Sequence, residues 1–229
     1  IAGGSIANAG ILLSTDNLSL GSTGGAVTNR GSVVAGGALT VTGSGGLQNS
    51  GLIRAQSFDY VSPVALSFGA SSQVVADTLS ITAPGLANAG LILGQQRLAL
   101  NTTSGTETLT NTGILSGAVM TLTAAGDVAQ EGMAQSTGAL TATAQGTLST
   151  GAASQTLGNT VLLEGKGVAL AGQVSSTQSA TLTAGTDGLT SSADLTASSL
   201  SLTSAGTAQL GGVTDVTGAA TLAAAGTLG

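Results

Sequence analysis

The tripeptide Asn-x-Gly recurs along the first half of the chain at a spacing of about twenty residues. Its five copies begin at Asn8, Asn29, Asn49, Asn88 and Asn111, and one copy is missing between the third and the fourth. Apolar residues keep this period beyond the last copy, so the 229 residues contain about eleven repeats. A fixed period of this size indicates a repeat architecture. The remaining positions equivalent to the Asn are expected to be Ala70, Gln130, Thr150, Leu170, Ser191 and Leu210.

Three columns of apolar residues keep the same register. One begins at Ile6, two residues before the Asn position, and is expected to include Phe68 in the fourth repeat. A second begins at Leu12, four residues after it, and is expected to include Ser154 in the eighth repeat. The third is a pair of residues two apart, which is the period of a strand. Its members are Leu18/Leu20, Leu39/Val41, Phe58/Tyr60, Leu79/Ile81, Leu98/Leu100, Met120/Leu122, Leu140/Ala142, Val161/Leu163, Ala180/Leu182, Leu200/Leu202 and Ala220/Leu222.

A unit of twenty residues cannot bury an apolar face by itself, so its copies must stack on one another. The fold that stacks them is a parallel β-helix, in which each repeat forms one coil and equivalent positions align. Right-handed winding is expected because parallel crossovers are overwhelmingly right-handed. The sequence therefore predicts an all-β fold, a single right-handed parallel β-helix (solenoid) with about eleven coils of about 20 residues. With coils about 4.8 Å apart, the rod is roughly 50 Å long.

Residues 1–229 are expected to form one continuous β-helical repeat domain without a linker. The chain opens on Ile1 and has no signal peptide, so we expect an internal fragment of a longer protein. Residues 1–125 carry the Asn-x-Gly coils, whereas residues 126–229 form Ala/Thr/Ser-rich coils. Pro63 and Pro84 cannot donate to a ladder, so they are expected at turns or bulges. The segment from Phe58 to Phe68 is the least regular and is expected to bulge outward.

The five Asn residues are expected to form a structural turn ladder along the rod. Asn tolerates the left-handed backbone region, and Gly enters it without steric cost. Stacked Asn side chains can also hydrogen-bond to backbone groups at successive turns. A ligand-binding role for these residues is the alternative.

The only aromatic residues, Phe58, Tyr60 and Phe68, fall within eleven positions of one another. One interpretation is that they fill a locally wider core. The other is a binding patch on an irregular coil, because aromatic residues are enriched at binding hot spots.

The composition excludes several classes of function. The chain has no His and no Cys, so the usual zinc and copper ligand sets and the Ser-His and Cys-His nucleophile systems cannot form. Its ten carboxylates scatter around the coil, without the facing pair that glycoside hydrolysis needs. Four basic residues and a net charge of −6 argue against nucleic acid as a partner. We expect no enzyme activity, no metal, no cofactor and no small-molecule substrate. Lys166 and Asp187 are adjacent in register and are expected to form a surface ion pair.

Two kinds of unit alternate along the first 125 residues. Asn-containing units such as Leu47-Gln48-Asn49-Ser50-Gly51-Leu52-Ile53 are followed by strands such as Met120-Thr121-Leu122-Thr123. In this the repeat resembles the haemagglutinin-type repeats of filamentous haemagglutinins and related two-partner-secreted exoproteins of Gram-negative bacteria. That family includes adhesins and the stalks of contact-dependent inhibition effectors. The resemblance implies a secreted or cell-surface virulence protein that passes through an outer-membrane transporter during export.

Three functions are compatible with these observations. The leading hypothesis is a structural shaft segment of a secreted bacterial surface filament that presents a distal adhesive or toxin domain. A second is a directly adhesive module that binds a receptor or glycan on host or neighbouring cells, through exposed Thr and Ser residues or the 58–68 coil. A third is a segment that inserts into a target outer membrane during effector delivery, because β-structure poor in charge is compatible with insertion.

Overall fold

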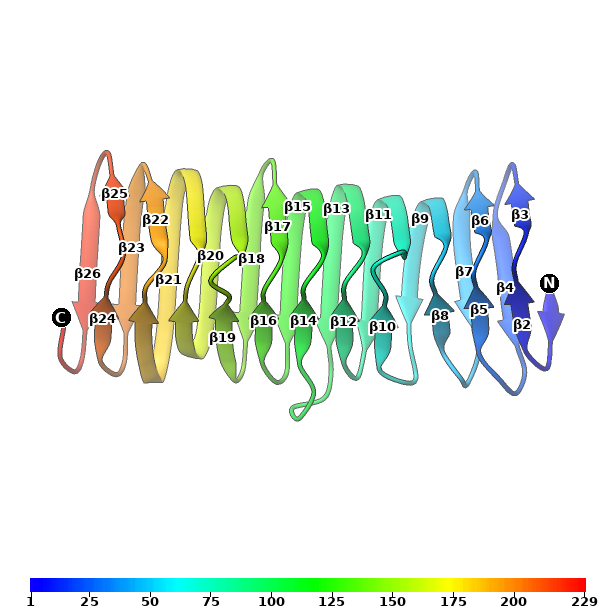
Figure 1. Ribbon diagram of the computed structural model, residues 1–229, viewed down its shortest axis with the longest axis horizontal. Coiled ribbons are helices and arrows are strands. Elements are labelled where there is room, and N and C mark those ends of the chain that lie inside the picture. The colour runs from blue at the N-terminus through cyan, green and yellow to red at the C-terminus, as the bar shows by residue number, and fades with distance from the viewer.

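The computed structural model describes all residues from 1 to 229 and is a single parallel β-solenoid (Figure 1). It has 26 strands and no helix, so no helix of the chain could cross a membrane. Successive coils pair in parallel at steps between 18 residues, from Gln73 to Leu91, and 23 residues, from Leu91 to Ile114. Strands on the near side run upward and those on the far side run downward while the chain advances from right to left, so the winding is right-handed (Figure 1).

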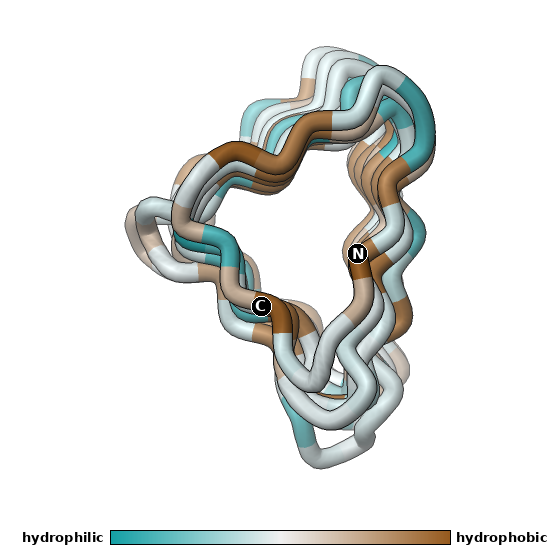
Figure 2. The backbone as a smooth tube through the Cα atoms, turned by 90° about the vertical axis from the view of Figure 1, so that its right-hand side faces the viewer, coloured by the Kyte–Doolittle hydropathy of each residue, from teal (hydrophilic) through white to brown (hydrophobic).

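Each coil has three sides, as the view along the axis shows (Figure 2). The first side, here called the Asn face, contains the Asn-x-Gly positions and is built from short strands. These strands are β2 (Ile6–Asn8), β5 (Val27–Asn29), β8 (Leu47–Asn49), β10 (Leu66–Phe68), β12 (Leu86–Asn88), β14 (Leu109–Asn111), β16 (Val128–Gln130), β19 (Thr147–Thr150) and β24 (Ala208–Leu210). The ends of the two longest strands, β20 (Gln155–Leu170) and β21 (Gln173–Ser191), complete this face.

The second and third faces follow in each coil, and several strands run across the corner between them. Strands confined to the second face are β3 (Ile11–Ser14), β6 (Ser32–Ala35), β17 (Met133–Ser136), β22 (Asp194–Ala197) and β25 (Thr214–Val216). Strands confined to the third face are β1 (Ala2–Gly3), β4 (Leu18–Ser22), β7 (Ala38–Thr42), β18 (Ala139–Ala144), β23 (Ser199–Ser204) and β26 (Ala220–Ala224). Strands that cover both are β9 (Leu52–Val61), β11 (Gln73–Ala83), β13 (Leu91–Thr102) and β15 (Ile114–Ala124), and β20 and β21 cover both before they reach the Asn face.

A single hydrophobic core of 49 buried residues fills the coil from end to end. The paired column of the third face is in the predicted register, as the pairings of Leu79 with Phe58 and Leu98 illustrate. Apolar side chains at equivalent positions of successive coils therefore pack on one another. Burying each Leu or Ile contributes about 1.5–3 kcal/mol, and that contribution exists only because a neighbouring coil covers the side chain.

The predicted register is wrong in the fourth and eighth coils. Phe68, and not Ala70, occupies the Asn position, because it pairs with Asn49 of the preceding coil and with Asn88 of the following coil. Leu66 takes the place that the apolar column was expected to give to Phe68. In the eighth coil Thr156, and not Ser154, follows Ala134 in the second-face column. Both errors have one cause, which is a corner two residues longer than in the neighbouring coils.

The two long corners share a sequence and a geometry. Residues 69–73 read Gly-Ala-Ser-Ser-Gln, and residues 151–155, which lie 82 positions later, read Gly-Ala-Ala-Ser-Gln. In each corner the serine N–H donates to the carbonyl of the first glycine, over 2.8 Å from Ser72 to Gly69 and 3.0 Å from Ser154 to Gly151. The chain thus repeats at a second level, in groups of four coils that end at a serine corner.

The segment from Phe58 to Phe68 does not bulge outward. Its first part continues β9 in regular pairing with β11, and its last three residues form β10. The bend between them holds Pro63, and Pro84 also lies in a bend, as expected for both. The clearest outward excursion is instead residues 103–108, between β13 and β14, which projects below the other corners (Figure 1).

Candidate functional site

The Asn residues of the first three coils form one buried chain of side-chain hydrogen bonds, here called the first ladder. Asn8 Nδ2 donates to Asn29 Oδ1 over 2.8 Å, and Asn29 Nδ2 donates to Asn49 Oδ1 over 2.7 Å. Asn49 Nδ2 then donates to Ser72 Oγ over 2.7 Å, because Phe68 stands at the Asn position of the fourth coil. All four polar residues are buried. The first ladder therefore consists of three amides that end on a serine.

A second ladder begins one coil above Phe68. Asn88 Nδ2 donates to Asn111 Oδ1 over 2.8 Å, and Asn111 Nδ2 donates to Gln130 Oε1 over 2.9 Å. The sequence predicted the Asn column but not this division into two, because Phe68 was assigned to a different column. Each ladder is directional, since every Asn amide in it donates to the coil that follows it in the chain.

The same amides also bind the backbone at the corner, as expected. Asn49 Nδ2 donates to the Gly51 carbonyl over 2.9 Å, and Asn29 Nδ2 reaches the Leu52 carbonyl over 3.0 Å. In the first copy the Gly10 N–H donates back to Asn8 Oδ1 over 3.2 Å. These bonds close the turn between the Asn face and the second face.

The expected left-handed backbone is absent from every Asn-x-Gly copy. Positive φ angles occur only at Gly46, Gly172, Gly188 and Gly212. The motif needs its glycine for another reason: a Cβ on Gly31 or Gly113 would approach the backbone of the preceding coil to under 3.0 Å. Glycine is therefore required at this position because a side chain would prevent successive corners from stacking closely, and not because the backbone is left-handed.

The three aromatic rings lie inside the coil. Phe58, Tyr60 and Phe68 are each 1% exposed, so they fill the core and do not form a patch on the surface. The rings of Phe58 and Tyr60 stack with centroids 5.8 Å apart and planes 12° from parallel. Burial raises the pKa of the Tyr60 phenol above its usual value of 10.0, and the hydrogen bond with Ser62 opposes that shift. An external partner cannot reach these rings.

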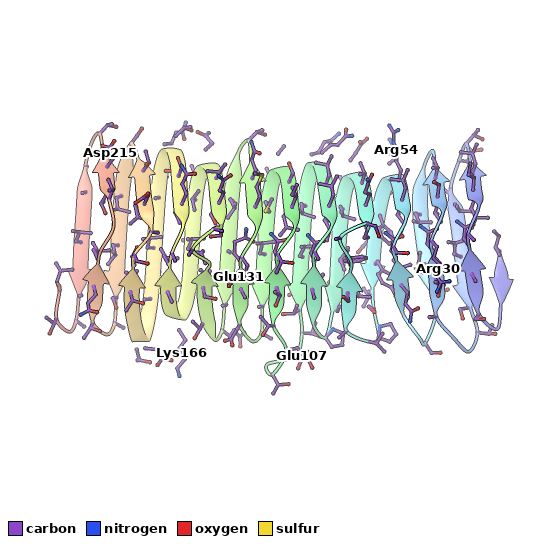
Figure 3. The ribbon with its side chains drawn as sticks, in the orientation of Figure 1. Arg30, Arg54, Glu107, Glu131, Lys166 and Asp215 are labelled. Atoms are coloured by element: carbon purple, nitrogen blue, oxygen red, sulfur yellow. The ribbon has the colours of Figure 1, made fainter.

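Charged side chains are spread along the surface, and oppositely charged residues share a hollow at Arg54 and Asp77 and at Glu164 and Lys166. The labelled charges in Figure 3 illustrate this, with Arg54 and Asp215 along one edge of the rod and Glu107 and Lys166 along the other. Lys166 and Asp187 form the one salt bridge, with 3.1 Å between Nζ and Oδ2, as predicted from their register. No group of three or more carboxylates could hold a metal ion.

The surface hollows are lined mainly by Ser, Thr, Gly and Ala residues. The two largest have volumes of about 620 and 610 Å³. Glu164 and Lys166 line the first, whereas uncharged residues such as Ser149, Thr190 and Gln209 line the second. Thr143 and Thr183 flank Glu164 in register in the first hollow, but no hydroxyl side chain there hydrogen-bonds to the carboxylate or to Lys166. The most organised polar arrangement in the molecule is therefore the buried pair of ladders, which is closed to solvent and carries no titratable group.

The comparisons with known proteins give no relative. No protein-family model matches the chain, and neither a characterised protein nor a solved structure matches it. The resemblance to haemagglutinin-type repeats therefore stays a prediction, whereas the structure shows the parallel β-solenoid.

Proposed function

We propose that this chain is a shaft segment of a secreted bacterial surface filament, which presents a distal adhesive or toxin domain. The observation that carries the proposal is the uninterrupted stack of coils around one core. Each coil contacts only its neighbours, so length can be added or removed without changing any site. Eleven coils at about 4.8 Å give a rod roughly 50 Å long.

Two further features support a shaft. Polar ladders stabilise the interior of the first seven coils and fix the rotational register between coils, because each Asn amide bonds the coil that follows it. The chain has only 14 charged residues in 229, and they form no cluster that could hold a metal ion. A rigid spacer needs the first property and does not need a functional site of its own.

The experiment is an in-frame deletion of one four-coil group in the complete filament protein. Removing residues 72–153 joins Ser71 to Ser154 and keeps the long corner intact. We expect a filament shorter by roughly 20 Å, with surface display and distal activity retained. The matched control removes residues 72–143 and breaks the register, and it should abolish display. Normal display with complete loss of cell binding would contradict the shaft.

A directly adhesive module is the second candidate, and one observation favours it. Outward-facing hydroxyl residues align across coils on the third face, where Thr121 pairs with Thr141 and Thr181 pairs with Ser201. Such a column could contact a receptor or glycan repeatedly. Saturable binding of the isolated chain to cells, abolished by Thr121→Val with Thr141→Val and retained in Thr28→Val, would support adhesion. Outer-membrane insertion is tested by flotation with liposomes, in which insertion requires the chain to float.

A further inference from the structure

The two ladders are built alike but end differently. Each has three amides, and the corresponding members lie 80 to 82 positions apart: Asn8 and Asn88, Asn29 and Asn111, Asn49 and Gln130. The first ladder closes on a hydroxyl, because Asn49 Nδ2 donates to Ser72 Oγ over 2.7 Å. The last member of the second ladder is a Gln, whose Oε1 accepts from Asn111 but whose Nε2 is buried without a partner.

Ser154 stands where the first ladder has its terminal serine. Both serines are the fourth residue of a long corner, and both follow the Asn position by four. Their carbonyls accept equivalent backbone bonds, from Leu91 to Ser72 over 2.9 Å and from Gln173 to Ser154 over 3.0 Å. The backbone thus places Ser154 against Gln130 as it places Ser72 against Asn49. Ser154 Oγ is nevertheless buried and unpartnered.

No protein group accepts a hydrogen bond from Gln130 Nε2. Thr150 occupies the Asn position of the coil that follows Gln130, but its hydroxyl bonds the backbone of Ala171 in the coil after that. It donates to the Ala171 carbonyl over 2.7 Å and accepts from the Ala171 N–H over 2.9 Å. Leaving a buried donor and a buried acceptor unpaired costs about 1–3 kcal/mol for each group. Gln130 Nε2 and Ser154 Oγ are two such groups at the positions that bond directly in the first ladder, so they call for a common partner.

We propose that a buried water molecule occupies this corner and bridges Gln130 Nε2 to Ser154 Oγ, closing the second ladder as a direct bond closes the first. The extra methylene of Gln changes where the terminal nitrogen lies, while Oε1 stays fixed by Asn111, so the direct contact made by Asn49 is not reproduced. Gly172 keeps space above the serine, since a Cβ there would lie 3.0 Å from Ser154 Oγ.

The corner offers the number of partners that a buried water needs, which is about three. The amide of Asn111 reaches the carbonyls of Gly113 and Met133, over 3.3 and 3.1 Å. The positions equivalent to these around Gln130 are Gly132 and Gln155. The water could then accept a hydrogen bond from Gln130 Nε2, bond to the Ser154 hydroxyl, and donate to one of these carbonyls.

The test is a high-resolution crystal structure of the chain together with an exchange of the two terminal amides. In the wild type we expect water density within hydrogen-bond distance of both Gln130 Nε2 and Ser154 Oγ. Gln130→Asn should expel the water and give the direct amide-to-serine bond of the first ladder. Asn49→Gln should do the reverse and admit a water beside Ser72. The two variants are matched, because each ladder serves as the control for the other.

Solution NMR supplies a second measurement that does not depend on crystals. The side-chain amide protons of Gln130 should show a cross-peak to long-lived water, and this cross-peak should be lost in Gln130→Asn. A direct bond between Gln130 Nε2 and Ser154 Oγ in the wild-type crystal structure would overturn the proposal. So would a dry corner that shows neither density nor a water cross-peak.

Discussion

At the scale of single residues, the ladders explain why asparagine is the repeated residue. Its side chain carries both donors and an acceptor, so identical residues stacked coil on coil satisfy one another. A column of Asp would place like charges about 4.8 Å apart, and a column of Leu would lose the side-chain hydrogen bonds between coils and to the corner carbonyls. Asn29 illustrates the point, because it accepts from Asn8 and donates to Asn49.

Replacing Asn29 with Ala should therefore destabilise the rod more than the loss of a few side-chain atoms would suggest. The change leaves Asn49 Oδ1 without its donor inside the core, and it removes one of the three acceptors of Asn8 Nδ2 and the bond from Asn29 to the Leu52 carbonyl. We expect the free energy of unfolding to fall by about 1–3 kcal/mol, measured by urea denaturation. Asn101→Ala is the control, because that side chain is half-buried on the third face and makes no hydrogen bond. Equal losses in the two variants would contradict the account.

Tyr60 predicts a loss of stability at alkaline pH. Burial raises the pKa of its phenol in the folded state above the ordinary 10.0, so the neutral form is favoured by folding. That contribution is complete below pH 10 and is lost as the pH rises through the folded-state pKa. Tyr60→Phe should make stability less dependent on pH above 10, measured by urea denaturation at several pH values. Since Tyr60 is the only tyrosine, its absorbance change reports the ionisation directly, and ionisation near pH 10 in the folded state would contradict the prediction.

At the scale of elements, the corners vary while the strands repeat. Most corners between the Asn face and the second face have two residues, and the corners of the fourth and eighth coils have four. The 103–108 loop lies at a different corner, between the third face and the Asn face, and most of its residues are exposed. Connecting segments of this kind tolerate insertion because few core contacts depend on them.

An insertion test separates the permissive loop from the stacked corners. Ten Gly and Ser residues placed between Gly105 and Thr106 should leave the thermal midpoint nearly unchanged, as followed by circular dichroism. The same insert between Glu131 and Gly132 should lower it strongly, because Gly132 N–H donates to the Asn111 carbonyl over 2.9 Å and its Cα packs on the coil before it. A strong loss from the 105/106 insert would mean that the loop supports the adjoining coils.

The sequence predicts the strands of this fold better than its corners. The third-face pairs were all in the correct register, because alternation with a period of two leaves no other solution. The register predicted for the fourth coil is wrong because Phe68 is apolar and fits either of two columns. The register predicted for the eighth coil is wrong because Ser154 and Thr156 are chemically alike. A comparison of residues 69–73 with residues 151–155 would have revealed both long corners. The separation of Gln130 Nε2 from Ser154 Oγ depends on one methylene group and is not visible in any pattern.

At the scale of the whole molecule, the core changes character along the rod. The third and fourth coils bury the largest side chains, among them Phe58, Tyr60 and Phe68. The ninth coil buries smaller ones, such as Val174, Ala180 and Ala184. Neither ladder extends into this part of the chain. Since the stability of a solenoid is close to a sum over coils and their contacts, it should differ between the two halves.

Hydrogen exchange can measure that difference between matched coils. The third coil (residues 47–61) and the ninth (residues 168–184) each have two coils between them and an end of this chain, so fraying should affect them equally. We expect slower amide exchange in the third coil, where Ile53 and Tyr60 are covered on both sides, than in the ninth, where Ala180 buries less apolar area. The Ala180→Leu variant tests whether the exchange rate of the ninth coil depends on the packing of its core or on its position in the rod. If the core is what limits opening, this variant should slow exchange in the ninth coil, provided the larger side chain fits. If the two coils exchange at one rate in the wild type, the rod opens as a single unit, and the change of core along its length has no effect on local stability.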